Sequence, residues 1–250
     1  MNSRCRAVSD HDGEARAGRA GRVGVLKELV FLLLWFLVFI KLDGLVGTDA
    51  VAAHTDALRL QELEQVLHVD VERSANAWLV GRPALGRAGV YLYRLYYVVV
   101  LGVLLWVFVR RAEVYRRVRR TMVAMMALVL LVYWAVPMSP PRFALVGVVD
   151  VVARYDIAGQ AARESWTSPH HFTAMPSMHV GWALWCAYAI AVAHPRLAPV
   201  AWLFPLVMAA DVLATGNHYV LDIVGSVLLL AAAALAERGS RLVLRGDPAG

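Results

Sequence analysis

His218 and Asp222, in the C-terminal part of the sequence, have the types and spacing of half a catalytic triad. They are four residues apart, so on a helix they lie on the same face. A carboxylate in that position accepts the Nδ1 proton of the imidazole, which fixes the tautomer and leaves Nε2 free as a nucleophile or base. The pair taken alone is equally compatible with a buried polar contact between helices.

An upstream segment combines a helix start with a second histidine. Pro176 suits the first turn of a helix and Ser177 suits its N-cap. Unsatisfied backbone N–H groups at a helix start bind anions, and a phosphate fits such a site. His179 could then protonate a leaving oxygen. Helix capping alone would also explain the serine.

Arg142, which follows Pro140 and Pro141, adds a phosphate binder. Its planar, permanently charged guanidinium matches the oxygens of a phosphoryl group, although a single arginine at a membrane interface is more often a residue that reaches toward water. With two histidines, one backed by Asp222, and a helix start, Arg142 completes a binder, an acid and a nucleophile. That set is what phosphoryl transfer without a metal requires. We expect no metal and no cofactor, since no His-x-x-x-His or Glu-rich set accompanies the histidines.

The composition places this chemistry in a membrane. Of the 250 residues, 60% are apolar and 18% are charged, and the apolar residues gather in runs such as Leu29–Ile40 and Val98–Val109. The runs are continuous rather than alternating, which predicts helices and not a barrel. The only two cysteines, Cys5 and Cys186, cannot form a disulfide framework or a four-cysteine zinc site.

The sequence therefore predicts an all-α fold, an integral membrane six-helix bundle with extracytoplasmic loop helices. The expected spans are Val25–Leu42, Tyr91–Val109, Thr121–Met138, Pro176–Ala193, Leu197–Ala214 and His218–Leu235. They divide the chain into an Arg-rich tail at 1–24, expected to be disordered, a membrane domain at 25–237 and a second tail at 238–250. No internal repeat supports a secondary transporter.

The basic residues predict the orientation of these spans. Those nearest the span ends are Arg4, Arg6, Arg16, Arg19, Arg22, Arg110, Arg111, Arg116, Arg117, Arg119, Arg120, Arg238, Arg241 and Arg245. With six spans they share one side, which the distribution of Lys and Arg makes the cytoplasmic side. Both termini are then cytoplasmic, and the connections 43–90 and 139–175 face outward. The three polar segments that carry the candidate residues, Val136–Arg142, Ala174–His179 and Thr215–Asp222, lie on the same outer side. Because the basic residues fall between apolar runs, we expect no nucleic-acid partner.

The first outer connection contains an amphipathic pattern. Leu60, Leu63, Leu67 and Val71 recur at helical spacing among polar residues, which predicts a helix on the outer membrane interface with Trp78 as an anchor. A helix that only packs on the bundle fits the pattern at least as well.

These motifs resemble a known family. Pro140-Pro141-Arg142, then Pro176-Ser177-Met178-His179, then His218 followed by Asp222 are similar to the three signature motifs of the type-2 phosphatidate phosphatase superfamily, and are closest to its inositol-phosphorylceramide-synthase-like branch and the bacterial relatives of that branch. The resemblance spans about 137–226. It implies a six-helix membrane enzyme that forms a phosphohistidine on lipid phosphates or phosphodiesters without a metal.

The resemblance also assigns roles to residues. It implies that His218 is the nucleophile, Asp222 its orienting partner and His179 the general acid, and that Ser177 and Arg142 bind the phosphate. Two family cations are missing, because Ala135 stands in place of a lysine and Asp211 and Val212 stand in place of a Ser-Arg pair.

Two explanations for the missing cations stay open. In the first, Asn217, Thr215 and helix N-termini complete the phosphate shell. In the second, which we favour slightly, outer-loop residues such as Arg154, Arg163, His170 or His171 do so. Asp211 lies within an expected span, where an acid is costly, and we expect it to be structurally paired.

The sequence thus predicts a membrane-embedded, metal-independent lipid phosphate phosphatase or phosphotransferase. Its substrate is a membrane lipid phosphate, and a polyol or a sugar is a possible acceptor. The site faces outward from a membrane expected to be the bacterial inner membrane. The alternative is a non-catalytic protein that binds or transports a phospholipid or carrier lipid and retains the phosphate pocket. The lipid, the acceptor and the oligomeric state do not follow from the sequence.

Overall fold

The computed structural model describes residues 24–46, 48–155 and 172–245. The chain divides into two compact units, Met1–Leu42 and Asp43–Gly250. Residues 24–43 are helical, in agreement with the first expected span. The expected tail at 1–24 lies outside the described residues except for Gly24. The expected C-terminal tail begins as helix, because α11 (Val220–Arg245) extends through 238–245.

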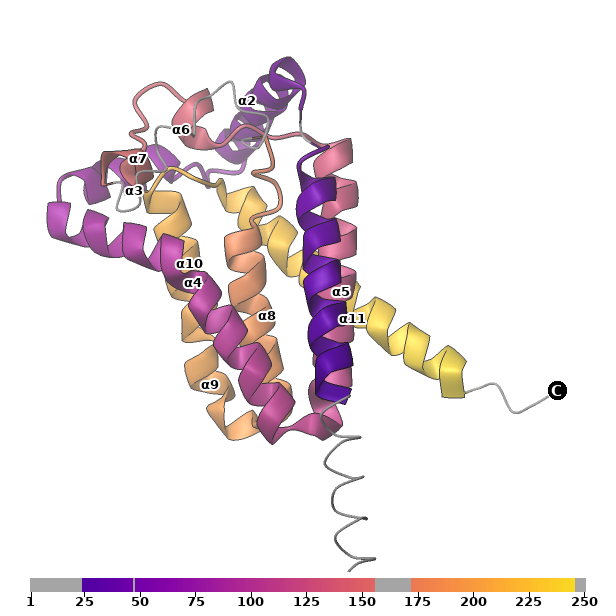
Figure 1. Cartoon of the computed structure of the whole chain (residues 1–250). Helices are drawn as coiled ribbons and strands as arrows, with labels where there is room; N and C mark the ends of the chain where they lie inside the picture. The colour runs from indigo at the N-terminus through magenta and orange to yellow at the C-terminus, as the bar shows by residue number, and fades with distance from the viewer. Residues whose placement is uncertain (1–23, 47, 156–171, 246–250) are drawn as a thin grey trace, which may run out of the picture. The chain divides into compact units, whose positions relative to one another are not determined.

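The second unit is built from helices (Figure 1). In order they are α2 (Ala50–Val66), α3 (Glu72–Val80), α4 (Pro83–Arg110), α5 (Ala112–Ala135), α6 (Pro141–Ala144), α7 (Val151–Arg154), α8 (Met178–Ala193), the 3-10 turn η3 (Pro195–Leu197), α9 (Ala198–Ala201), α10 (Leu203–Ala214) and α11. Within the described ranges no strand forms, and one isolated bridge joins Met138 to Thr173. The prediction of an all-α fold is confirmed for this part of the chain.

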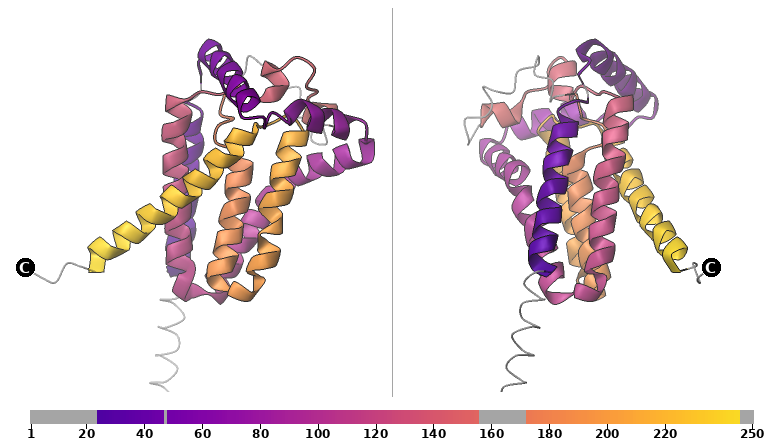
Figure 2. Two further views of the ribbon diagram at one scale, coloured as in Figure 1. Left: turned by 180° about the vertical axis from the view of Figure 1, so that it is seen from behind. Right: turned by 45° about the vertical axis from the view of Figure 1, so that its right-hand side comes forward.

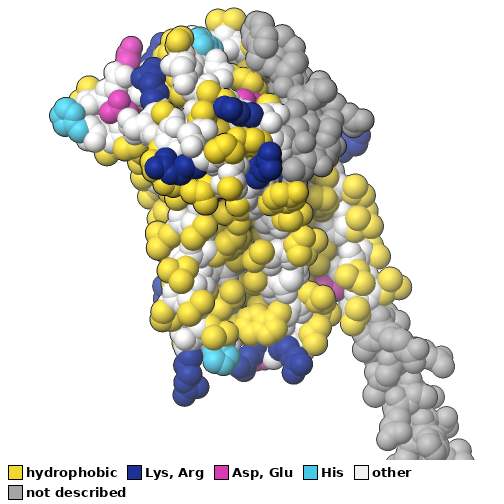
Figure 3. All heavy atoms as spheres, turned by 90° about the vertical axis from the view of Figure 1, so that its left-hand side faces the viewer, with side chains coloured by type: hydrophobic (Ala, Val, Ile, Leu, Met, Phe, Trp, Pro, Cys, Tyr) yellow, Lys and Arg dark blue, Asp and Glu magenta, His cyan; other side chains and the backbone are white. Residues whose placement is uncertain are grey.

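Four of the described helical segments are long and apolar enough to cross a membrane. They are Pro83–Arg110, Ala112–Ala135, Pro195–Ala214 and Val220–Leu242. Helix α8 is apolar but has only 16 residues. Val98, Leu101 and Leu105 on α4 are exposed, and in Figure 3 hydrophobic side chains cover the flank of the helices while Lys and Arg gather at the two ends of that face. These features support an integral membrane protein, and the six-helix bundle stays a prediction.

Helix α8 packs against α4, α10 and α11. Ala183 and Ala187 on α8 have no exposed surface, and such small residues let helix backbones approach closely. Trp185 is fully buried, and its indole N–H donates to the carbonyl oxygen of Val118 on α5 at 3.2 Å. Helix α8 is thereby fixed among the helices around it, and so is the residue at its start.

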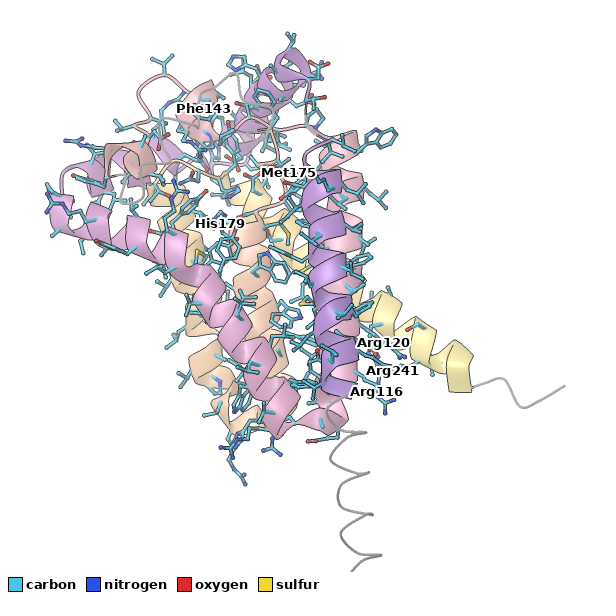
Figure 4. The ribbon with its side chains drawn as sticks, viewed as in Figure 1. Arg116, Arg120, Phe143, Met175, His179 and Arg241 are labelled. Atoms are coloured by element: carbon cyan, nitrogen blue, oxygen red, sulfur yellow. The ribbon has the colours of Figure 1, made fainter. Side chains whose placement is uncertain are left out.

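Short helices gather at one end of this unit. In the three views of Figures 1 and 2, α2, α3, α6 and α7 lie at the same end as the first residues of α8 and α11. Figure 4 shows His179 and Met175 at that end, and Arg116 and Arg120 of α5 at the other. The start of α8 is therefore far from the arginines in the first turns of α5.

Two expectations about helix boundaries are wrong. The expected stripe from Leu60 to Val71 is interrupted, because α2 ends at Val66 and the chain turns at His68, whose φ is 57°. Leu63 and Leu67 are exposed, whereas Leu60 is buried. Ala53, Ala57, Gln61 and Glu64 are the other inward residues of α2.

The expected third span is also shifted toward the N-terminus. Helix α5 runs from Ala112 to Ala135 rather than from 121 to 138. Arginines are good helix formers, so the basic connection continues the helix. At the other end the helix stops before Pro137.

Candidate active site

The structure brings the three polar segments into direct contact. Backbone hydrogen bonds join the first segment to the second, from the Met138 N–H to the Phe172 carbonyl at 2.7 Å and from the Ala174 N–H to the Met138 carbonyl at 3.1 Å. The Arg142 N–H donates to the Gly216 carbonyl at 2.9 Å and so joins the first segment to the third. These main-chain contacts make one site from distant parts of the sequence.

His218 lies just before α11, is 5% exposed, and has two partners at Nδ1, of which Asp222 was expected. Its Nδ1 is 3.2 Å from Oδ2 of Asp222 and 2.9 Å from the carbonyl oxygen of Ala174. A carbonyl oxygen can only accept a hydrogen bond, so Nδ1 carries the proton. The lone pair of the neutral ring is then on Nε2, as a nucleophile requires.

Asp222 has no exposed surface and is itself held by the main chain. Its Oδ2 also accepts from the Tyr219 N–H at 2.9 Å, which is the reach of a residue in the first helical turn back to the helix start. One carboxylate oxygen therefore orients both the helix end and the imidazole. The expected contact between His218 and Asp222 is present, although His218 lies before α11 rather than on its face.

His179 lies beside His218, with 5.9 Å between their ring centroids and 56° between their planes. Its ring stacks on Tyr93 at a centroid distance of 4.0 Å and lies 4.6 Å from the ring of Tyr96. Both tyrosines come from α4. The two histidines are thus near enough to contact one phosphoryl group from two sides, and the tyrosines fix the plane of His179.

Ser177 occupies the N-cap of α8. Its Oγ accepts from the Val180 N–H at 3.4 Å, and its own N–H donates to the Asp222 carbonyl at 3.3 Å. The residue has no exposed surface. Ser226 of α11 donates to the Ser177 carbonyl at 2.8 Å, so Ser177 links the starts of α8 and α11.

Arg142 is held by two partners. Its Nε lies 3.2 Å from Oδ2 of Asp150 in an ion pair, and its Nη1 donates to the side-chain carbonyl of Asn217. The amide nitrogen of Asn217 donates to Thr215 Oγ1 at 2.7 Å. One of the two explanations left open by the sequence makes Asn217 and Thr215 phosphate ligands. In this structure Asn217 holds Arg142 and donates to Thr215, and phosphate binding by the two residues stays a prediction.

Gly216 and Asn76 bring these segments together. Gly216 follows the cap residue of α10 with a φ of 78°, and a Cβ there would lie 2.7 Å from Val148 Cγ1. Asn76 on α3 is 1% exposed. Its Nδ2 donates to the Val149 carbonyl at 2.9 Å and to the Ala214 carbonyl at 3.0 Å, and its Oδ1 accepts from the Val149 N–H at 2.8 Å. Asn76 thereby ties α3 and the 149 loop to the end of α10.

The sequence interpretation missed a second arginine near the histidines. Arg94 lies on α4 between Tyr93 and Tyr96, and its charge interacts electrostatically with His179, as does that of Arg142. The signal was available in principle, because an arginine inside an apolar run is expensive and usually functional.

Of the outer-loop cations that we favoured, only Arg154 lies within the described residues. It is exposed, with its guanidinium 5.7 Å from the ring centroid of Tyr155. Arg163, His170 and His171 lie outside the described residues.

The departures from the family motifs lie on two helices, Ala135 at the end of α5 and the neighbours Asp211 and Val212 on α10. Ala135 is an exposed residue at the end of α5, and Val212 is buried on α10. Asp211 is buried beside Gly89 of α4, where a Cβ would come within 2.5 Å of Oδ1. The expected pairing of Asp211 is not seen, since within the described part of the chain its Oδ2 accepts no hydrogen bond.

The fold and the site together define an all-helical protein with membrane-length apolar helices and a paired-histidine centre at one end. A family profile described as the PAP2 superfamily matches residues 58–236, which is more than half of the chain, and the chain belongs to this superfamily. Membership supports a phosphatase-type activity on lipid phosphates and an enzyme of the phosphoric ester hydrolase type. Searches of curated proteins and of solved structures returned no match.

Proposed function

We propose that this protein is a metal-independent lipid phosphate phosphatase or phosphotransferase that works through a phosphohistidine on His218. The observation that carries the proposal is the pairing of His179 and His218, 5.9 Å apart between ring centroids, with Nδ1 of His218 committed to Ala174 and Asp222. That arrangement presents a nucleophilic nitrogen and an acid to the same small group.

The reaction has two displacements. In the first, the Nε2 lone pair of His218 attacks phosphorus in line, the bond from phosphorus to the lipid oxygen breaks, and the His179 imidazolium gives its proton to that oxygen. In the second, an acceptor oxygen attacks the phosphohistidine, His179 takes the proton of the acceptor, and the bond from phosphorus to nitrogen breaks. Asp222 stabilises the positive charge that His218 gains between these steps.

Two arginines and a helix start supply the phosphate shell. Arg142 and Arg94 both place positive charge near His179, and Ser177 opens α8 with its N-terminal end at the same place. Arginine favours the spread charge of a phosphoryl group in transfer. Arg94 then provides one of the two positive charges that the family motifs contain and that the motifs of this chain lack.

The acceptor decides between a phosphatase and a transferase. Water gives a phosphatase, and a polyol or sugar hydroxyl gives a transferase of the inositol-phosphorylceramide-synthase-like type. The side chains described above serve both outcomes, because acceptor choice depends on how well the pocket excludes water.

The proposed orientation places this chemistry at the outer membrane interface. The site lies at the end of α8 and α11 opposite Arg116 and Arg120, and basic connections stay on the cytoplasmic side. We therefore propose an integral protein of the bacterial inner membrane with cytoplasmic termini. The lipid-binding or transport alternative gains no particular support from the contacts at the site.

The test is turnover by detergent-purified protein with a panel of lipid phosphates, with and without polyols and with EDTA, following inorganic phosphate and new lipid species. We expect turnover that EDTA leaves unchanged, no turnover by His218→Ala, and a loss of about 10²- to 10⁴-fold in His179→Ala. His194→Ala, at the other end of α8, is the matched control and keeps wild-type activity.

Three results would change the proposal. Tight lipid binding without turnover favours the alternative, and a metal-reversible loss with EDTA indicates a metalloenzyme. Normal turnover by His218→Ala rules out the mechanism.

A further inference from the structure

Two buried glutamates, which the mechanism does not use, cap the helix that follows His218. Oε1 of Glu64, on α2, accepts from the Leu221 N–H at 2.7 Å, and Oε1 of Glu72, on α3, accepts from the Val220 N–H at 3.1 Å. Neither residue has any exposed surface. They satisfy the first free N–H groups of α11, which an ordinary cap residue or a bound anion would otherwise satisfy.

The second carboxyl oxygen of each glutamate indicates whether the pair carries one negative charge or two. Within the described part of the chain, Oε2 of Glu64 and Oε2 of Glu72 accept from no N–H or O–H donor. Each carboxyl group lies close enough to the other to influence its pKa. A carboxylate only accepts hydrogen bonds, so the two second oxygens can be joined only by a proton that one of the glutamates carries.

The surroundings disfavour a second negative charge. Burial raises the pKa of Glu64 to about 8 and also raises the pKa of Glu72 above its ordinary value. The titratable and charged groups that face the pair are Asp70 and Arg73 beside Glu72, and Tyr219 and Asp222 at the start of α11. One negative charge suits the positive end of α11, whereas two would repel each other and Asp222.

We propose that Glu64 and Glu72 are positioning residues for His218, and that they hold the start of α11 in place only while they share one proton. The role rests on the proposed function, since it concerns the nucleophile of that reaction. When the second carboxyl ionises, the two carboxylates repel, α2 and α3 loosen from Val220 and Leu221, and the ring of His218 loses its fixed position. The pair thereby sets an alkaline limit to activity.

The sign of the pH effect follows from the proton count. Above a pH of about 4.5 an unfolded glutamate is ionised, whereas the folded pair keeps its proton up to about pH 8. Between these values the folded chain binds more protons than the unfolded chain, so stability falls as pH rises and then levels off. A variant that lacks the shared proton should lose this dependence of stability on pH.

The experiment compares Glu64→Gln with Glu62→Gln in the full-length protein in detergent. Glutamine keeps the acceptor for the Leu221 N–H and donates to Glu72 without titrating, whereas Glu62 is an exposed residue two positions away on the same helix. The midpoint of thermal unfolding is measured across this pH range. We expect the curve of Glu64→Gln to be flatter than that of the wild type, and the curve of Glu62→Gln to run parallel to it.

Activity provides the second readout. With a lipid phosphate that the wild type turns over, the alkaline fall in kcat/KM should move to higher pH in Glu64→Gln and stay in place in Glu62→Gln. Glu64→Ala should lose activity at every pH, because it removes the cap itself. If no substrate is turned over, the proposed function fails, while the unfolding curves still decide whether the proton is shared.

Two outcomes would overturn the proposal. Parallel unfolding curves for the wild type and Glu64→Gln show that no shared proton is lost in this range. Glu72→Gln repeats the test from α3. If both glutamine variants unfold at a pH where the wild type stays folded, the helix needs two charges rather than a shared proton.

Discussion

At the scale of single residues, the backbone contributes as much to the site as the side chains do. The carbonyl of Ala174 settles which nitrogen of His218 carries the proton, and Asp222 also holds a main-chain N–H. Side-chain types and spacing predicted the His218 and Asp222 pair. They could not predict the Ala174 contact, because it depends on where a residue 44 positions upstream lies.

We expect the positive charge of Arg94 to contribute to the reaction. Arg94→Gln should lower kcat/KM by about a hundredfold, the loss typical of removing one donor to the developing charge, because the transferred phosphoryl group loses a cation. Steady-state kinetics on the substrate found in the panel measures the effect. The control is Arg87→Gln, an exposed residue on the same helix that lies over Tyr155, and it should change little.

The opposite pattern would remove Arg94 from the phosphate shell. If Arg94→Gln kept wild-type kcat/KM while Arg142→Gln lost it, one arginine would be sufficient for the reaction.

At the scale of elements, the site depends on how helices start and end. Helix α8 starts with Ser177 as its cap, α11 starts with three carboxyl groups on its first N–H groups, and α10 is followed by a left-handed turn at Gly216. Apolar runs predicted the long helices well. They failed at 112–120, where arginines continue a helix. They also failed at 60–71, where Gln61 and Glu64 face inward with Leu60 while Leu63 and Leu67 are exposed.

We expect the turn after α10 to require glycine at position 216. Gly216→Ala should lower the free energy of unfolding by more than about 2 kcal/mol, because the left-handed conformation alone costs about 1–2 kcal/mol with a side chain and the Cβ meets Val148. Activity should fall with it, since the Gly216 carbonyl accepts from the Arg142 N–H. Chemical or thermal unfolding in detergent measures the loss.

Gly102→Ala is the matched control for Gly216→Ala. Gly102 lies within α4 with nothing near its added Cβ, and alanine in a helix interior is favoured over glycine by up to about 1 kcal/mol. A Gly216→Ala protein as stable as Gly102→Ala would show that the turn tolerates a side chain.

At the scale of the whole molecule, three distant stretches of sequence make one site at the end of the helices away from the basic connection. The distribution of arginines predicted that the three stretches share a membrane side, and the motifs predicted most of the residues. The sequence could not predict the contacts that hold those residues in place. Asp150 and Asn217 on Arg142, Tyr93 on His179, and the glutamates on α11 all come from contacts between segments that no local pattern links.

The most direct test of the central claim is to trap the covalent intermediate. Purified protein is mixed with a radiolabelled lipid phosphate, quenched within one turnover and digested, and the labelled peptide is identified by mass spectrometry. We predict an acid-labile phosphate on His218, absent in His218→Ala and unaffected in His194→Ala. Label on another residue, or turnover by the wild type with no covalent phosphate on His218 at any quench time, would contradict it.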